Sequence, residues 1–174
     1  FHEFGHTLHH ILTAQTEPQV SGINGVEWDA VELPSQFLEN FAWEHEIVKS
    51  ISAHVETGEQ LRDELFDKMI AAKNYEAGAF CVRQVEFALF DMLLHSAFDP
   101  KTDSVHALLD SVRREVAVVF PPAWNRFPQS FSHIFAGGYG AGYYSYKWAE
   151  VLSADCFSAF EEEGVLNPDT GRRY

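Results

Sequence analysis

The sequence predicts an all-α fold. Apolar residues recur at spacings of three and four along most of the chain, strand-like alternation is scarce, and Pro and Gly gather between the periodic segments. The 174 residues are 46% hydrophobic and include 15 Phe, 6 Tyr and 4 Trp. A chain of this length and apolar content can bury a substantial core, which excludes an intrinsically disordered protein.

Two helices and a connecting loop are expected in the first part of the chain. The first helix spans 1–14 and ends where the segment 13–28 carries a density of Pro, Gly and Asn that no helix tolerates. The second helix spans 29–43. Asp29 is a suitable N-cap for it, and Pro34 lies near its first turn, where a missing N–H group matters least.

The later helices follow from the same periodicity. They are expected over residues 46–55, 59–73, 75–97, 102–119 and 143–163. The segment 75–97 is apolar around most of its circumference, so we expect a buried helix with the Phe/Leu stripe of 80–94 in the core. Pro100 and the Pro121–Pro122 pair end the neighbouring helices, and a Gly-rich run over 137–142 precedes the last one.

The charge balance restricts the class of partner. Lys and Arg number 12 against 26 Asp and Glu, a formal net charge of −14, so no basic cluster is available for nucleic acid or an anionic membrane. No apolar run approaches the roughly 20 residues of a membrane helix. Two cysteines, Cys81 and Cys156, are too few for a secreted disulfide framework and predict reduced thiols and a cytoplasmic location.

One motif carries recognisable chemistry. Residues 2–6 read His-Glu-Phe-Gly-His, the H-E-x-x-H pattern. On a helix, His2 and His6 share one face and can bind one zinc ion, with Glu3 beside them as the base that takes a proton from water. Gly5 costs about 1 kcal/mol relative to Ala within a helix, which indicates that something packs close to the helix backbone.

A catalytic zinc ion usually takes a third protein ligand. The second helix offers Asp29, Glu32 and Glu39, and spacing alone does not choose among them. We favour Glu32 as the ligand, with Asp29 or Glu39 accepting an imidazole N–H hydrogen bond, because zinc-bound histidines usually donate their second nitrogen. His9 and His10 lie off the His2/His6 face or one turn beyond it, so we interpret them as helix-surface or supporting residues.

Three separated blocks resemble a known family. They are His2-Glu3-Phe4-Gly5-His6, the run from Ser21 to Gln36 that contains Val31-Glu32-Leu33-Pro34-Ser35-Gln36, and the run from His133 to Trp148. In this order and spacing they closely resemble the thimet oligopeptidase family of zinc metallopeptidases, and most of all its bacterial oligopeptidase A branch. The resemblance covers essentially the whole chain. It implies a helical catalytic half of an enzyme that encloses its site in a channel.

The resemblance implies a role for each metal-site residue. His2 and His6 match the two zinc-binding histidines, and Glu32 matches the third ligand, for one zinc ion per chain. Glu3 matches the general base. This agrees with the preference for Glu32 reached from the residues themselves.

The resemblance also implies roles in the later block. His133 matches a histidine that contacts the substrate or transition state, and Tyr146 matches a tyrosine that hydrogen-bonds the developing oxyanion. Tyr139 and Tyr143 match tyrosines implicated in substrate contact. A phenolic O–H at an oxyanion is physically reasonable, and the glycines of 137–142 would let the segment close over a peptide.

We therefore expect a zinc-dependent metalloendopeptidase that hydrolyses internal bonds of short oligopeptides. Residues 1–174 are expected to be a partial catalytic domain, truncated at both ends and starting at the H-E-x-x-H helix. Three alternatives stay open: a dipeptidyl carboxypeptidase of the same family, a catalytically silent helical module stabilised by zinc, and a plain helical bundle with fortuitous histidines that binds no stoichiometric metal.

Overall fold

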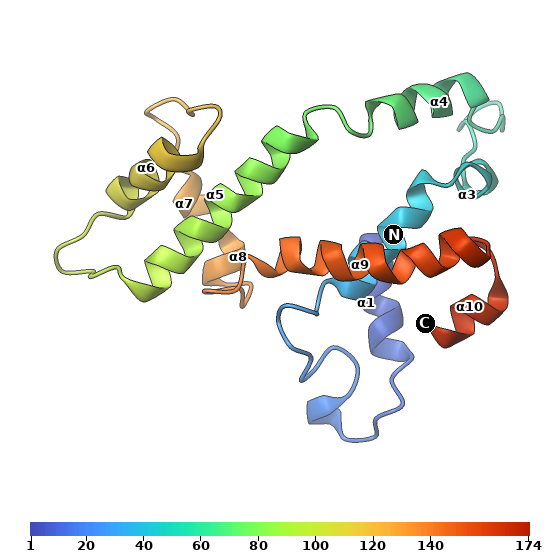
Figure 1. Ribbon diagram of the computed structural model, residues 1–174, viewed down its shortest axis with the longest axis horizontal. Helices are drawn as coiled ribbons and strands as arrows, with labels where there is room; N and C mark the ends of the chain where they lie inside the picture. The colour runs from blue at the N-terminus through green and yellow to red at the C-terminus, as the bar shows by residue number, and fades with distance from the viewer. The chain divides into compact units, whose positions relative to one another are not determined.

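The computed structural model describes residues 1–174, and every regular element in it is helical (Figure 1). The α-helices are α1 (His2–Ile11), α2 (Leu33–Glu39), α3 (His45–Ile51), α4 (Asp63–Ala72), α5 (Ala77–Ser96), α6 (Val105–Val116), α7 (Phe127–Ser130), α8 (Ser132–Phe135), α9 (Ser145–Glu163) and α10 (Pro168–Arg173), with 3-10 helices η1 (Pro18–Val20) and η2 (Asn40–Trp43). The predicted all-α fold is confirmed. None of these helices combines the length and apolarity needed to cross a bilayer.

The chain divides into two compact units. The first unit comprises residues 1–75 and 148–174, and the second comprises residues 76–147, so the boundary falls in the first turn of α9. Each unit buries its own cluster of hydrophobic side chains, so each has a separate hydrophobic core.

The core of the first unit is built from phenylalanines of α2 and α9. Phe37, Phe157 and Phe160 are buried together. The ring of Tyr174, which follows α10, stacks on Phe37 with 3.8 Å between ring centroids. Burial raises the pKa of the Tyr174 hydroxyl, because the charged phenolate would lose its hydration.

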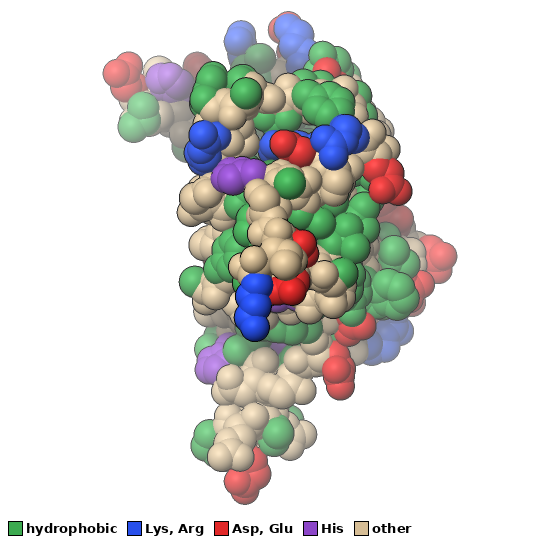
Figure 2. All heavy atoms as spheres, turned by 90° about the vertical axis from the view of Figure 1, so that its left-hand side faces the viewer, with side chains coloured by type: hydrophobic (Ala, Val, Ile, Leu, Met, Phe, Trp, Pro, Cys, Tyr) green, Lys and Arg blue, Asp and Glu red, His purple; other side chains and the backbone are tan.

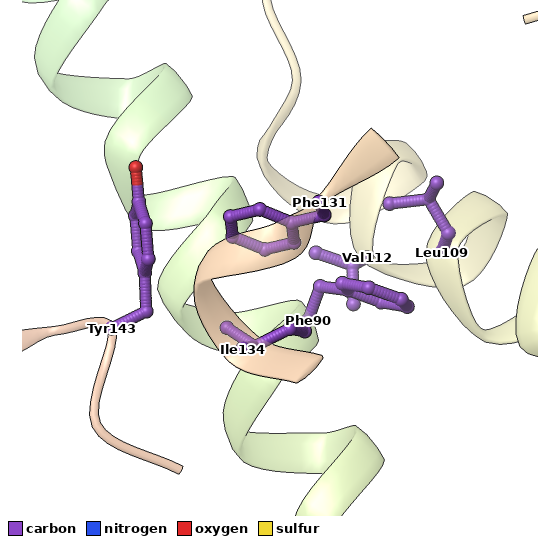
Figure 3. Close-up of a cluster of buried hydrophobic side chains, with 6 residues drawn as sticks. All are labelled: Phe90, Leu109, Val112, Phe131, Ile134 and Tyr143. Atoms are coloured by element: carbon purple, nitrogen blue, oxygen red, sulfur yellow. The ribbon is translucent and has the colours of Figure 1, made fainter. Parts of the chain in front are cut away.

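The second unit is organised around α5. Helix α6 begins after Ser104, whose hydroxyl accepts a hydrogen bond from the backbone N–H of Ala107, and runs back alongside α5 (Figure 1). Figure 3 shows how side chains of the segment around α7 and α8 point toward the α5–α6 pair. The buried cluster consists of Phe90, Leu109, Val112, Phe131, Ile134 and Tyr143.

The second helix begins later than predicted, and Asp29 does not cap it. Residues 27–33 form successive turns, and α2 starts at Leu33 with Glu32 at the N-cap position. A helix running on from Asp29 would place Pro34 in its interior, where the ring meets the carbonyl of Ala30 and the N–H group is missing. After Glu39 the chain tightens into η2. The other predicted helices are present, with ends displaced by a few residues.

The expectation that α5 is buried on most of its circumference was wrong. Phe80 is 63% exposed and Val85 is 43% exposed, while Glu86 and Asp91 are buried beside Phe90. Hydrophobic side chains also lie at the surface among charged ones in the view from the α6 side of Figure 1 (Figure 2). Burial of the two carboxylates is possible because each has hydrogen-bond donors, and an apolar count along the helix cannot anticipate such partners.

A short helix, α10, follows α9. It spans Pro168–Arg173, and Asn167 is its N-cap. The side chain of Asn167 accepts a hydrogen bond from the backbone N–H of Asp169 at 2.9 Å, and Pro168 occupies the first helical position. These are strong helix-start signals, and they outweigh the turn preference of the same residues.

Candidate functional site

Gly5 allows α1 to lie directly against the start of α2. A Cβ atom at Gly5 would be 2.4 Å from the carbonyl oxygen of Pro34 and 2.5 Å from the Cα atom of Ser35. Both neighbours are backbone atoms, so no side-chain movement could make room for it. The predicted close approach to this helix is confirmed, and it brings the histidine face of α1 over the carboxylate that precedes α2.

Three donor atoms meet at this helix contact. The Nε2 atoms of His2 and His6 lie 3.3 Å and 3.2 Å from Oε2 of Glu32. The two imidazole rings stand edge to face, with 5.1 Å between centroids. All three donor atoms lie within 4.8 Å of one another, so the structure brings together the three residues predicted as metal ligands.

The geometry of this donor set fits zinc. For bonds of about 2.05 Å at tetrahedral angles, neighbouring donor atoms are expected about 3.3 Å apart. The two measured N···O separations match that edge length. Two imidazoles and one carboxylate also match the ligand chemistry of catalytic zinc, which keeps its fourth position open. Glu32 is only 1% exposed, and a carboxylate that buried is greatly stabilised by a nearby cation.

Two groups orient the candidate ligands. Oε1 of Glu39 lies 2.6 Å from Nδ1 of His2, so Glu39, rather than Asp29, takes the acceptor position that the sequence left open between them. The hydroxyl of Ser35 lies 2.8 Å from Oε2 of Glu32 and 2.9 Å from its carbonyl oxygen. His6 differs, because its Nδ1 atom is buried without a hydrogen-bond partner.

Ser35 was not among the predicted site residues. Its signal in the sequence is its place three residues after Glu32, one turn into a helix whose start is marked by Pro34. A hydroxyl at that spacing can reach back to the N-cap side chain. The sequence therefore contained the signal, but it could be interpreted only once the helix start was placed correctly.

Glu3 has a different environment from the other carboxylates. Its side chain is exposed and makes no hydrogen bond or ion pair within the chain, whereas Glu32 and Glu39 are both engaged. The hydroxyl of Thr7 binds only the backbone carbonyl of Glu3. The Glu3 carboxylate is thus available to a water molecule or substrate.

The two histidines beyond the motif do not join the donor set. Nδ1 of His10 accepts a hydrogen bond from the backbone N–H of Ile23 at 3.4 Å, and its ring packs against Gly22, so it fastens the loop after α1. Burial, together with the charges of His6 and His10, lowers the pKa of His9 and favours its neutral form. This agrees with their interpretation as helix-surface or supporting residues.

The four residues predicted from the later block form a second cluster, here called the tyrosine cluster: His133, Tyr139, Tyr143 and Tyr146. The ring of His133 lies 6.2, 5.8 and 6.0 Å from the rings of Tyr139, Tyr143 and Tyr146. Tyr139 and Tyr146 stack at 5.0 Å, and Tyr143 lies 5.1 Å from Tyr146. Residues spread over fourteen positions are thus gathered in one place within the second unit.

The members of the tyrosine cluster differ in burial. Tyr143 is 8% exposed, and its hydroxyl donates a hydrogen bond to Oε1 of Gln84 at 2.9 Å. Burial raises the pKa of this hydroxyl despite the nearby charge of Arg83. His133 is exposed, and Tyr139 and Tyr146 are half-buried. Sequence reasoning missed Gln84, because nothing in the pattern of α5 marks it as a partner of a tyrosine 59 residues later.

Comparison with known proteins gives one family. The sequence signature of peptidase family M3 matches residues 1–174. The chain is 59% identical over 175 residues to oligopeptidase A of Salmonella typhimurium and 59% identical over 175 residues to oligopeptidase A of Escherichia coli. It is 34% identical over 176 residues to a dipeptidyl carboxypeptidase of Salmonella typhimurium. Each match covers the whole of this chain.

The matched region is only about a quarter of the length of these relatives. The chain spans 26% of each oligopeptidase A and 25% of the dipeptidyl carboxypeptidase. The similarity therefore concerns the region that contains the donor set and the tyrosine cluster.

Proposed function

Because the chain belongs to peptidase family M3, we propose that the full-length protein is a zinc-dependent metalloendopeptidase that hydrolyses internal bonds of short oligopeptides. The observation that carries this proposal is the meeting of His2, His6 and Glu32 at separations that suit a tetrahedral zinc ion. Residues 1–174 would form part of the catalytic domain, with one zinc ion per chain. The free thiols of Cys81 and Cys156 suit a reducing, cytoplasmic environment.

The proposed chemistry assigns a distinct task to each carboxylate. His2, His6 and Glu32 would hold the ion, which when bound lowers the pKa of its water to about 7 and polarises the scissile carbonyl. Glu3 would accept the proton of the attacking water and deliver it to the leaving amine. Glu39 would keep His2 in the tautomer that presents Nε2 to the ion, because it accepts the hydrogen on Nδ1.

The tyrosine cluster would act on the substrate. We assign to Tyr146 the hydrogen bond to the developing oxyanion, a contribution of roughly 3 to 4 kcal/mol in a well-formed site. His133 would contact the substrate or transition state, since it is the exposed member of the cluster. Tyr139 and Tyr143 would contact the peptide. Tyr139 is the better placed of the two, because the hydroxyl of Tyr143 is already engaged by Gln84.

The endopeptidase assignment is favoured over a dipeptidyl carboxypeptidase. The chain is 59% identical to proteins named oligopeptidase A and 34% identical to one named dipeptidyl carboxypeptidase. Product analysis on a peptide with a blocked C-terminus separates the two, because an endopeptidase does not require a free terminal carboxylate. Release of internal fragments supports the proposal, whereas cleavage only of unblocked peptides supports the alternative.

The proposal is tested by Glu3→Gln in the full-length protein. We expect kcat to fall by roughly 10²- to 10⁴-fold with zinc content unchanged, because the base is lost and the ligands are not. Glu46→Gln is the matched control, since Glu46 is an exposed carboxylate in the first turn of α3, and it should leave kcat unchanged. Intact hydrolysis in the Glu3 variant would overturn the mechanism. Bound zinc with no hydrolysis in the wild type would support a silent module instead.

A further inference from the structure

The second unit contains a buried carboxylate that the proposed mechanism does not use. Asp91, in the second half of α5, is 1% exposed. Its Oδ1 atom accepts a hydrogen bond from the backbone N–H of Ala141, and its Oδ2 atom accepts one from the backbone N–H of Tyr143, both at 2.9 Å. Both oxygens are thus occupied by the segment that joins α8 to α9. Such paired N–H donors are strong partners for a buried carboxylate.

Neither of these two N–H groups has a backbone partner, unlike several of their neighbours in the segment. Within it, the N–H groups of Tyr139, Gly142 and Ser145 donate to backbone carbonyls at 3.0, 2.8 and 3.0 Å. Ala141 adopts a left-handed backbone conformation with φ of 57°. A non-glycine residue in this conformation costs free energy of about 1 to 2 kcal/mol and persists only where its surroundings hold it.

His95 strengthens the same attachment from the next turn of α5. Its Nδ1 atom lies 2.8 Å from Oδ1 of Asp91 and 2.9 Å from the backbone carbonyl oxygen of the same residue. A Cβ atom at Gly140 would lie 3.2 Å from Nε2 of His95, so the imidazole packs directly on the loop backbone. Asp91 and His95 therefore hold residues 140–143 against one face of α5.

The attachment reaches the tyrosine cluster through Tyr143. The backbone N–H of Tyr146 donates to the carbonyl of Tyr143, and the two rings lie 5.1 Å apart. The ring of Tyr139 in turn stacks on Tyr146. A shift of the Tyr143 backbone would therefore move the hydroxyl groups of both neighbouring tyrosines.

We propose that Asp91 is a positioning residue for peptide hydrolysis. By binding the N–H groups of Ala141 and Tyr143, it fixes the start of α9 and so the orientation of Tyr146. The catalytic part of this inference rests on the proposed function. The structural part, that Asp91 anchors the segment, stands independently and has its own measurement.

The anchor is tested by hydrogen exchange of the full-length protein. In Asp91→Asn an amide NH₂ group replaces one acceptor, so exchange in the segment 139–145 should accelerate by about tenfold or more, while α6 stays protected. Asp110→Asn, the same change at an exposed carboxylate of α6, should leave the segment unchanged. Equal protection of 139–145 in wild type and Asp91→Asn would overturn the anchor. If Asp91→Asn does not fold, Asp91→Glu, which keeps the charge but displaces the carboxylate, is measured in its place, and unchanged exchange there would likewise overturn it.

The positioning role is tested by a kinetic double-mutant cycle with Tyr146→Phe. Alone, Asp91→Asn should lower kcat by about 10- to 100-fold with KM changed less than about threefold, since a displaced group fails mainly in the transition state. On the Tyr146→Phe background it should cost less than about threefold, because the group it positions is already gone. Multiplicative losses would overturn the positioning role. The proposed function fails through a different result: wild-type protein that hydrolyses peptides without zinc, or that hydrolyses none. In that case the hydrogen-exchange result still decides whether Asp91 anchors the segment.

Discussion

The candidate metal site and the tyrosine cluster differ in how far apart in the sequence their stabilising partners lie. The donor set and its supporting acceptor Glu39 lie within residues 2–39. Their geometry follows from an i, i+4 helix register and one close helix contact at Gly5. The tyrosine cluster depends on Gln84 and Asp91, which lie 50 to 59 residues before the groups that they bind. Short-range geometry can be inferred from spacing, whereas long-range support becomes visible only in the fold.

Both regions nevertheless use the same physical device, a buried carboxylate with fixed partners. Glu32 and Asp91 are each 1% exposed. Glu32 faces two imidazole nitrogens, and together these groups can ligate a cation. Asp91 faces two backbone N–H groups, whose hydrogen bonds satisfy its carboxylate without a cation. The chemistry of the partners thus separates a candidate metal ligand from a structural anchor.

The largest expected effect on stability comes from adding a side chain at the close contact between α1 and α2. In Gly5→Ala the added Cβ atom would meet backbone atoms of Pro34 and Ser35 at 2.4 and 2.5 Å, so α1 and α2 must separate. We expect the free energy of unfolding to fall by about 3 kcal/mol and zinc affinity to weaken with it. Chemical denaturation and zinc titration of the full-length protein measure the two effects.

Gly78→Ala provides the matched control. Nothing lies within 4 Å of a Cβ atom at Gly78, on α5. The same substitution there should stabilise the helix by up to about 1 kcal/mol, because Ala loses less backbone entropy than Gly. Equal effects at both positions would contradict the view that Gly5 is required by a close helix approach.

A smaller effect is expected from the acceptor behind His2. Glu39→Gln removes the carboxylate 2.6 Å from Nδ1 of His2, and zinc affinity should weaken by about 10- to 100-fold. Competition with a chelator of known affinity measures the change. Asp29→Asn should leave the affinity unchanged. The reverse order of the two variants would contradict the assignment of Glu39 as the supporting acceptor.

The smallest effect is expected within the tyrosine cluster. Tyr143→Phe removes the hydrogen bond to Gln84 and should lower the free energy of unfolding by about 1 kcal/mol without affecting bound zinc. Tyr144→Phe, at a neighbouring tyrosine that is 40% exposed, should have no measurable effect. If Tyr143→Phe instead lowered hydrolysis more than tenfold at unchanged stability, the Tyr143 hydroxyl would act on the substrate and its hydrogen bond to Gln84 would not be its main role.

Much of the candidate site could be predicted from the sequence. His2, His6 and Glu32 come together as expected, because helix periodicity fixes the first two and the contact at Gly5 brings the third. The family resemblance indicated the four residues that form the tyrosine cluster. The choice between Asp29 and Glu39 could not be made from spacing, since it depends on where α2 begins, and Pro34 sets that start.

The parts that could not be predicted depend on partners far along the chain. The apolar run of α5 indicated a core helix, but Phe80 is exposed and Glu86 is buried. Burial of Glu86 is possible because it pairs with Arg113, 27 residues later in the chain. Nothing in the sequence distinguishes Asp91 from other polar residues of a helix, because its partners in the segment 140–143 lie about 50 residues later. A hydrophobic pattern reports where apolar residues recur, and it carries no information about such pairings.

The central claim is that His2 and His6, and no other histidine pair, bind zinc with Glu32. His6 and His10 are also four residues apart on α1, so they form the competing pair. Zinc stoichiometry of the full-length protein should fall from one per chain to near zero in His2→Ala and in His6→Ala, and remain at one in His10→Ala. Retention of zinc in His2→Ala, or its loss in His10→Ala, would contradict the account.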